Sequence, residues 1–249
     1  MMLKCNFKSI TTQKFGNSIN ENEDNILEPS ELEINSDTLV KFAVSDGATE
    51  SSFSKEWSDL LVSAYKDKPF EISRLADTLN AISFSWQSMA TAIELPWYAE
   101  QKAETGAFAT FLGLTINREE NIYTAVAIGD CTLFQIRNDE TIFTFPVTTI
   151  EEFGNTPNLF ASNQQYQTEI EKTVTYYNGS IQTNDLIVIA TDALAAWIFK
   201  EKDASEKPWN HLSNILNQGV EDFEIWLNNQ RKAGEIKNDD VTLIIIKFE

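Results

Sequence analysis

Three strongly apolar runs of this sequence each adjoin an aspartate, and this pattern constrains the fold more than any other feature. The pairs are 40–44 with Asp46, 186–190 with Asp192, and 241–248 with Asp239. A short apolar run of this kind is typical of a buried β-strand. A carboxylate at the end of a strand is held by the sheet and still faces solvent. The chain is therefore expected to fold around sheets whose ends carry acidic groups.

A fourth acidic motif, Asn22-Glu23-Asp24, lies near the start of the chain. Carboxylates that converge on one point repel each other unless a cation lies among them. Carboxylate and carbonyl oxygens are also the ligands that hard divalent cations prefer. The four motifs together predict a metal site built from oxygen ligands.

Composition and charge exclude several classes of protein. The chain has 249 residues, 42% of them hydrophobic, which is enough for a real core in one large domain or two small ones. Its formal net charge of −19 disfavours binding to nucleic acid or to an anionic membrane surface. No apolar run reaches the length of a membrane span, and residues 1–8 lack the apolar stretch of a signal peptide. With two cysteines and no CxxC motif, a cytoplasmic location is expected.

The sequence contains a single histidine, His211. A Ser-His-Asp or Cys-His catalytic arrangement would need this one imidazole, and no Gly-x-Ser-x-Gly motif accompanies it. His211 lies in a stretch with helical spacing, so we interpret it as an ordinary surface residue of a helix.

Periodicity indicates an α+β order of elements. Strands are expected at 39–46, 105–116, 122–128, 133–137, 141–145, 186–190 and 241–248. Helices are expected over 53–65, 72–93, 193–199 and 209–227, the last interrupted near Gly219. The short connections between the central strands require antiparallel pairing, and alternating βαβ units are absent. The order favours antiparallel sheets with helices on their outer faces, in one domain that spans residues 1–249.

Six motifs, in order along the chain, resemble those of the protein phosphatase 2C family of metal-dependent serine/threonine phosphatases. They are Asn22-Glu23-Asp24, Phe42–Gly47, Gly106–Thr110, Ala127–Asp130, Asp185–Asp192 and Asn238–Thr242. The resemblance implies a four-layer α-β-β-α sandwich with a centre for two Mn²⁺ or Mg²⁺ ions. It also implies the ligands: Asp46 would bridge both metals, Gly47 would offer its carbonyl, Glu23 would hold one metal, and Asp192 and Asp239 the other. Asp24 would be a nearby acid.

The same resemblance implies hydrolysis of phosphoserine or phosphothreonine on proteins, with water as nucleophile and a cognate kinase as a possible partner. An irregular flap near the active site would fall within the polar, weakly patterned segment 147–180. Two alternatives remain open: a non-catalytic signalling or binding domain on the same fold, and a phosphatase for small phosphate esters.

The chain departs from the family pattern at several positions. Ile19 stands where members often have an arginine that grips the phosphate, and nearby Lys14 cannot offer the same bidentate fork. Ala48 stands where some members have a histidine. An acid for a third metal would fall near Ala103, where Glu104 is a substitute. Gly-Asp dipeptides are common in turns, so Asp130 is interpreted as a turn residue.

Overall fold

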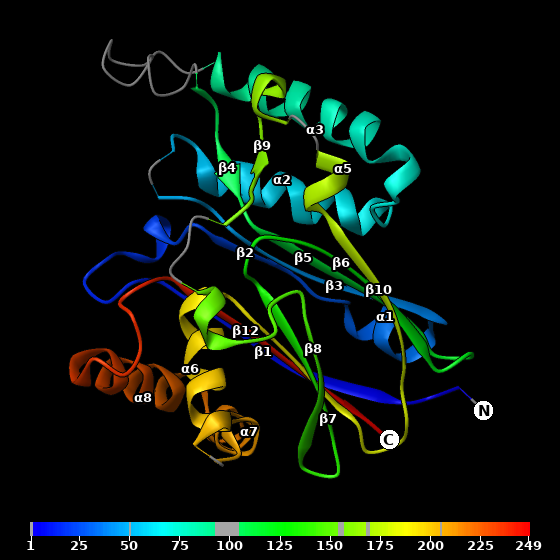
Figure 1. Cartoon of the computed structure of the whole chain (residues 1–249), viewed down its shortest axis with the longest axis vertical. Coiled ribbons are helices and arrows are strands. Elements are labelled where there is room, and N and C mark those ends of the chain that lie inside the picture. Colours follow the sequence, from blue (N-terminus) through cyan, green and yellow to red (C-terminus); the bar gives the residue numbers. More distant parts are fainter. Residues whose placement is uncertain (1, 50, 93–104, 154–156, 168–169, 205) are drawn as a thin grey trace.

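Two five-stranded antiparallel sheets pack face to face in the computed structural model, which describes residues 2–49, 51–92, 105–153, 157–167, 170–204 and 206–249 (Figure 1). The first sheet contains, in spatial order, β1 (Cys5–Thr12), β12 (Val241–Phe248), β11 (Leu186–Ala190), β7 (Thr132–Arg137) and β8 (Glu140–Phe145). The second contains β10 (Thr175–Ser180), β6 (Ile122–Ile128), β5 (Phe111–Asn117), β3 (Leu39–Asp46) and β2 (Asp24–Leu27). Strands from the two ends of the chain are neighbours, since β1 pairs with β12 from Cys5↔Phe248 to Thr12↔Val241.

Helices cover the outer face of each sheet. The second sheet is covered by α2 (Ser54–Asp67) and α3 (Leu75–Ala90), and the first by α6 (Asp192–Asp203), α7 (Pro208–Gln218) and α8 (Val220–Ala233) (Figure 1). The smaller elements are η1 (Ile19–Glu21), α1 (Glu31–Ser36), η2 (Ile72–Arg74), β4 (Phe108–Ala109), η3 (Ile150–Glu152), β9 (Phe160–Ala161), η4 (Gln164–Tyr166) and α5 (Ile170–Thr173). The expected α-β-β-α sandwich is confirmed.

Three layers of apolar side chains hold the sandwich together. Phe42, Leu114 and Ile189 belong to the layer between the sheets and are fully buried. A second layer joins the first sheet to α6, α7 and α8, and a third joins the second sheet to α2 and α3. A strand that is buried on both faces has apolar side chains on both sides of the sheet. This explains why the sequences of β11 and β12 are continuous apolar runs.

A buried ion pair fixes the start of β11. Asp185 is fully buried and accepts hydrogen bonds from Arg137 Nε and Nη2, both at 2.7 Å, from Gln135 Nε2 at 3.0 Å and from Gln182 N at 2.9 Å. Burial alone would raise the pKa of Asp185, but these hydrogen bonds outweigh it and hold the pKa below its usual value.

The expected strands and helices are present with small differences at their ends. The helical region at 209–227 is two helices that meet at Gly219, and the 193–199 helix continues to Asp203. Four strands were missed, β1, β2, β9 and β10, and the strand expected at 105–116 is two strands, β4 and β5. Each missed strand is short or carries exposed polar residues at alternating positions, because β1, β2 and β10 lie at the edges of their sheets.

Part of the segment 147–180 is regular structure, and its role as a flap stays a prediction. Residues 175–180 form β10, and Phe160 is fully buried in β9, which pairs with β4. The sequence did not predict β10 because it contains Asn, Gly and Ser, which are uncommon in strands. Among the described residues, no helix is long and apolar enough to cross a membrane.

Candidate active site

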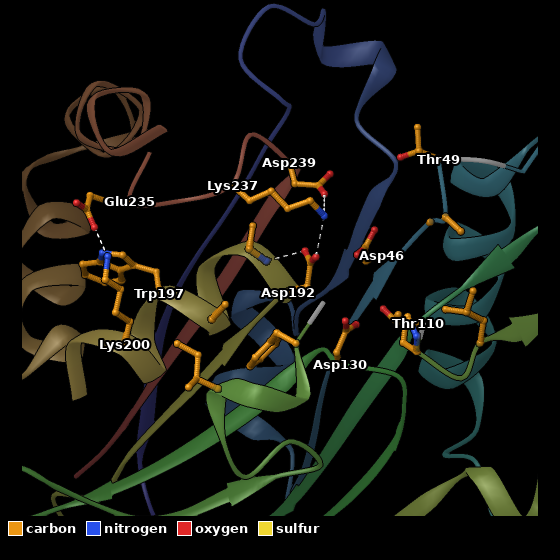
Figure 2. A pocket seen from close by; sticks show the side chains of 18 residues that line it. Asp46, Thr49, Thr110, Asp130, Asp192, Trp197, Lys200, Glu235, Lys237 and Asp239 are labelled. Atoms are coloured by element: carbon orange, nitrogen blue, oxygen red, sulfur yellow. Dashed lines mark hydrogen bonds and ion pairs between the residues drawn. The ribbon is translucent and has the colours of Figure 1, made fainter. Parts of the chain in front are cut away.

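Four aspartates from both sheets line one cavity of about 560 Å³ (Figure 2). Asp46 ends β3 of the second sheet, Asp192 begins α6 just after β11, Asp239 precedes β12, and Asp130 lies in the turn between β6 and β7. The three predicted strand-end carboxylates, Asp46, Asp192 and Asp239, are therefore brought together as the sequence suggested.

The backbone around Asp46 is tightly fixed. The Asp46 carbonyl accepts a hydrogen bond from Thr110 N at 2.9 Å, and Gly47 N donates to the Glu23 carbonyl at 3.3 Å. A Cβ at Gly47 would lie 2.9 Å from the carbonyl atoms of Ser54, so only glycine fits here. The close packing explains the Asp-Gly order of the motif and gives the strand end little freedom.

Asp24 connects the two sheets beneath the cavity. It pairs in register with Asp46 across β2 and β3, and its Oδ2 accepts hydrogen bonds from Thr242 Oγ1 at 2.8 Å and Thr191 Oγ1 at 3.1 Å, both from the first sheet. Its Oδ1 is buried and has no hydrogen-bond partner among the described residues. Burial raises the pKa of Asp24 to about 8. The Thr242 hydrogen bond lowers this pKa and the Asp240 charge raises it, and both effects are smaller than that of burial.

The Asp46 carboxylate is the least compensated group in the cavity. No group in the described part of the chain donates a hydrogen bond to it, and no lysine or arginine there forms an ion pair with it. Burial raises its pKa well above the usual value, and the charges of Asp24 and Asp192 add to the effect. Burial and the charge of Asp192 likewise raise the pKa of Asp130 to about 6.

Two lysines neutralise the other side of the cavity. Lys237 Nζ lies 2.6 Å from Asp239 Oδ2 and 3.3 Å from Asp192 Oδ2 (Figure 2). Lys14 Nζ lies 3.0 Å from Asp239 Oδ1 and 3.8 Å from Glu23 Oε2. Burial alone would raise the pKa of Asp239, but hydrogen bonds from Lys237 and Lys14 lower it below its usual value.

Glu23 is not brought into this cavity. Its carboxylate accepts a hydrogen bond from Ser54 Oγ, and its backbone N donates to Asp240 Oδ2 at 2.9 Å. Asp240 also accepts from Lys14 N at 2.8 Å, so it ties the N-terminal segment to the start of β12. The metal role predicted for Glu23 thus stays a prediction.

The chemistry of the donor set fits a divalent cation. Asp46, Asp130, Asp192 and Asp239 offer carboxylate oxygens to the cavity, which are the ligands that hard divalent cations prefer. The half-buried Asp46 carboxylate receives no hydrogen bond from the described residues, and the buried Asp24 Oδ1 atom has no partner among them. In the same part of the chain, no three acidic, histidine or cysteine side chains are already arranged around a single point. Lys237 holds the Asp192 and Asp239 oxygens, so a cation shared by these two aspartates would have to displace its ammonium group.

Two lining residues escaped the sequence interpretation. Asp130 was read as a turn residue, yet it lines the cavity together with Asp46. Its place in Ala127–Asp130, after a buried strand like the other aspartates, was the available signal. The sequence around Lys237 did not indicate a role in the site, because its contact with Asp192 exists only in the folded chain. Ala103 and Glu104, considered for a third metal, lie outside the described residues.

Neither His211 nor Cys131 lines this cavity. His211 is exposed on α7, as predicted. Cys131 is fully buried and shares a hydrogen bond with Thr110 Oγ1 at 3.0 Å. Burial raises the pKa of the Cys131 thiol well above its usual value, which disfavours a reactive thiolate.

The model of the family described as protein phosphatase 2C matches residues 21–228, a range that contains Glu23, Asp46, Asp130 and Asp192. The chain belongs to the protein phosphatase 2C family. No curated protein sequence matches it.

Solved structures of phosphatases share the fold at low sequence identity. The catalytic domain of the serine/threonine protein phosphatase PstP, in complex with two manganese ions, has a TM-score of 0.59 at 17% identity, with 99% of each chain covered. RsbX in complex with magnesium has a TM-score of 0.55 at 15% identity, with 100% of each chain covered. The phosphatase domain of SpoIIE from Bacillus subtilis has a TM-score of 0.52 at 13% identity, covering 100% of this chain and 93% of that one.

Proposed function

We propose that this protein hydrolyses phosphoserine and phosphothreonine on other proteins and needs a divalent cation, Mn²⁺ or Mg²⁺, to do so. Membership of the protein phosphatase 2C family supports the reaction class. The manganese bound to PstP and the magnesium bound to RsbX support the choice of cation. A phosphoprotein substrate implies a serine/threonine kinase that phosphorylates it.

The Asp46 carboxylate carries the proposal. It is half-buried at a rigid strand end, has no donor or counter-ion in the described part of the chain, and faces a cavity that Asp130, Asp192 and Asp239 also line. An uncompensated carboxylate close to other carboxylates costs free energy in the cation-free protein. A bound cation would remove this cost, so the arrangement fits a site that holds a cation.

Different residues of the cavity would bind the cations and the substrate. Asp46, Asp192 and Asp239 would hold two cations, with Asp130 beside them and Asp24 fixing the strand ends from below. When bound, such cations supply Lewis acidity that activates water and neutralises charge on the phosphoryl group. No protein nucleophile is then required, in accord with the inert Cys131.

Lys237 is the candidate for binding the phosphate. Ile19 is 73% exposed and cannot pair with an anion, whereas the side chain of Lys237 is 66% exposed and lines the cavity. Burial alone would lower the pKa of Lys237, but the hydrogen bond to Asp239 and the charge of Asp192 raise it, so the ammonium stays protonated. Cations on Asp192 and Asp239 would release this ammonium to the substrate.

A non-catalytic domain that binds a phosphorylated partner is the second candidate. The ion pairs of Lys14 and Lys237 favour it, because they already neutralise part of the acidic cluster. Ile19 favours it too, since the usual phosphate-gripping arginine is missing.

The test is hydrolysis of para-nitrophenyl phosphate and of a phosphothreonine peptide by protein stripped of metal. Activity on both that appears with Mn²⁺ and disappears with a chelator supports the proposal. Activity on the aryl ester alone would indicate a phosphatase for small esters. If neither substrate is hydrolysed but the phosphopeptide binds, the non-catalytic domain is correct.

A further inference from the structure

A second cavity, of about 660 Å³, adjoins the candidate active site. Trp197 and Glu235 line both cavities. Figure 2 shows Trp197 and Glu235 to one side of the aspartates, with Lys200 beside them. The wall also contains His211 of α7 and Trp226 of α8, so we call it the aromatic cavity.

Three aromatic rings from three helices meet in the aromatic cavity. The Trp197 and Trp226 ring centroids are 5.1 Å apart with their planes at 74°, and the His211 ring lies 5.2 Å from that of Trp226. The two tryptophan rings pack edge to face, so they contribute one continuous aromatic surface to the cavity wall. The negative face of an aromatic ring attracts cations, and tryptophan does so most strongly.

Carboxylates at the rim strengthen the preference for a cation. Glu201 and Glu206 line the aromatic cavity, and neither forms an ion pair with a lysine or arginine of the described chain. The one lysine in the wall, Lys207, is directed to Asp139, with Nζ and Oδ2 3.1 Å apart. Glu235, the third carboxylate of the wall, is paired with Lys200, so Glu201 and Glu206 are the carboxylates that remain for a cation supplied from outside.

Helix α6 sets the distance between the two cavities. It begins with Asp192 in the candidate active site and reaches Glu201 in the aromatic cavity. At the rise of an α-helix, these two residues are about 13 Å apart along the axis. An extended peptide covers that distance in about four residues.

We propose that the aromatic cavity binds a lysine or arginine side chain about four residues from the phosphoserine or phosphothreonine of the substrate. This inference rests on the proposed function and names its substrate class: phosphoproteins with a basic residue at that spacing. The net charge of −19 supports it, because an acidic protein attracts basic segments over long range.

The kinetic test compares phosphothreonine peptides that carry one arginine, placed two to six residues on either side, with the matched alanine peptide. Arginine near position four should raise kcat/KM by about tenfold, as expected for a cation that lies against an aromatic ring beside carboxylates. The variant Trp226→Leu/Glu206→Gln should lose this preference and keep its rate on para-nitrophenyl phosphate. Glu120→Gln, which removes a charge from the turn between β5 and β6, should keep the preference. If circular dichroism shows that Trp226→Leu unfolds, Glu201→Gln/Glu206→Gln takes its place.

A binding test separates this proposal from the proposed function. The unphosphorylated arginine peptide is titrated into ¹⁵N-labelled protein while the indole N–H signals are followed by NMR. Saturable shifts of the Trp197 and Trp226 signals, absent with the alanine peptide, support the aromatic cavity even if no peptide is hydrolysed. Equal hydrolysis of the arginine and alanine peptides, or indole signals that respond to neither, would overturn it.

Discussion

The Asp46 carboxylate is expected to matter more than any other single group. Asp46→Asn should reduce Mn²⁺-dependent hydrolysis of an aryl phosphate about a hundredfold to a thousandfold, the loss typical when a central electrostatic group is removed. It should also abolish any increase in melting temperature on adding Mn²⁺, while the metal-free variant melts no lower than the wild type because one of the clustered carboxylates is gone. Asp130→Asn should retain measurable activity, since Asp130 lies in a turn beside the cluster. Equal losses in the two variants would show that the ligand assignment is wrong.

Lys237 is expected to act on substrate binding. Lys237→Ala should raise KM for para-nitrophenyl phosphate about tenfold, the effect of losing a charged hydrogen bond, with a smaller change in kcat. Adding Ile19→Arg to this variant should lower KM again, because a guanidinium offers a bidentate contact to phosphate. Lys68→Ala, an exposed lysine after α2, is the control. An unchanged KM in Lys237→Ala, together with a large loss in Lys14→Ala, would assign the phosphate contact to Lys14 instead.

At the residue scale, the sequence predicted the groups that occupy strand ends. Asp46, Asp192 and Asp239 could be found because each adjoins an apolar run. The lysine ion pairs could not, since Lys237 meets Asp192 only when α6 and the β12 entry come together. The position of Glu23, turned toward Ser54, also depends on packing between β2 and α2 that no local pattern records.

Among the elements, β11 depends on the ion pair at its start. Arg137→Leu should lower the free energy of unfolding by about 2–4 kcal/mol at pH 7, because it leaves the buried Asp185 carboxylate without its partner. The pKa of Asp185 is lowered on folding, so its contribution is present above its unfolded value and is lost as the pH falls through the folded one. Urea unfolding from pH 7 down to pH 3 should therefore show the wild type converging on Arg137→Leu. A constant difference across that range would contradict the assignment.

Leu159, just before β9, and Phe160, the first residue of β9, are expected to differ in role. Leu159 lines the candidate active site, whereas Phe160 is fully buried and its carbonyl accepts a hydrogen bond from Trp57 Nε1 at 2.9 Å. Leu159→Ser should change the relative rates on different phosphopeptides and leave the melting temperature nearly unchanged. Phe160→Ala should cost about 3–5 kcal/mol of stability. If Leu159→Ser destabilises the protein as much as Phe160→Ala, the segment is structural and does not select substrates.

Elements with strong periodicity were predictable, and edge strands were not. The stripe of α3 and the apolar run of β11 each record burial directly in the sequence. In β1 and β10, alternate residues face solvent, so their patterns resemble loops. β1 and β10 are strands because they pair with β12 and β6, which are distant in the sequence, so a local pattern could not predict them.

For the whole molecule, the site exists only when both sheets are assembled. The second sheet supplies Asp46 and the first supplies Asp192 and Asp239, while Asp24 links them through Thr191 and Thr242. A cation that binds this cluster must therefore stabilise the entire sandwich, because the unfolded chain has no such site.

Titration calorimetry of Mn²⁺ into metal-stripped protein, with Asp46→Asn as the matched control, measures whether the strand-end aspartates bind a metal. We expect saturable binding to the wild type, with at least one site lost in Asp46→Asn. Indistinguishable heats for the wild type and the variant, or no binding to either, would contradict the claim that the strand-end aspartates form a metal site.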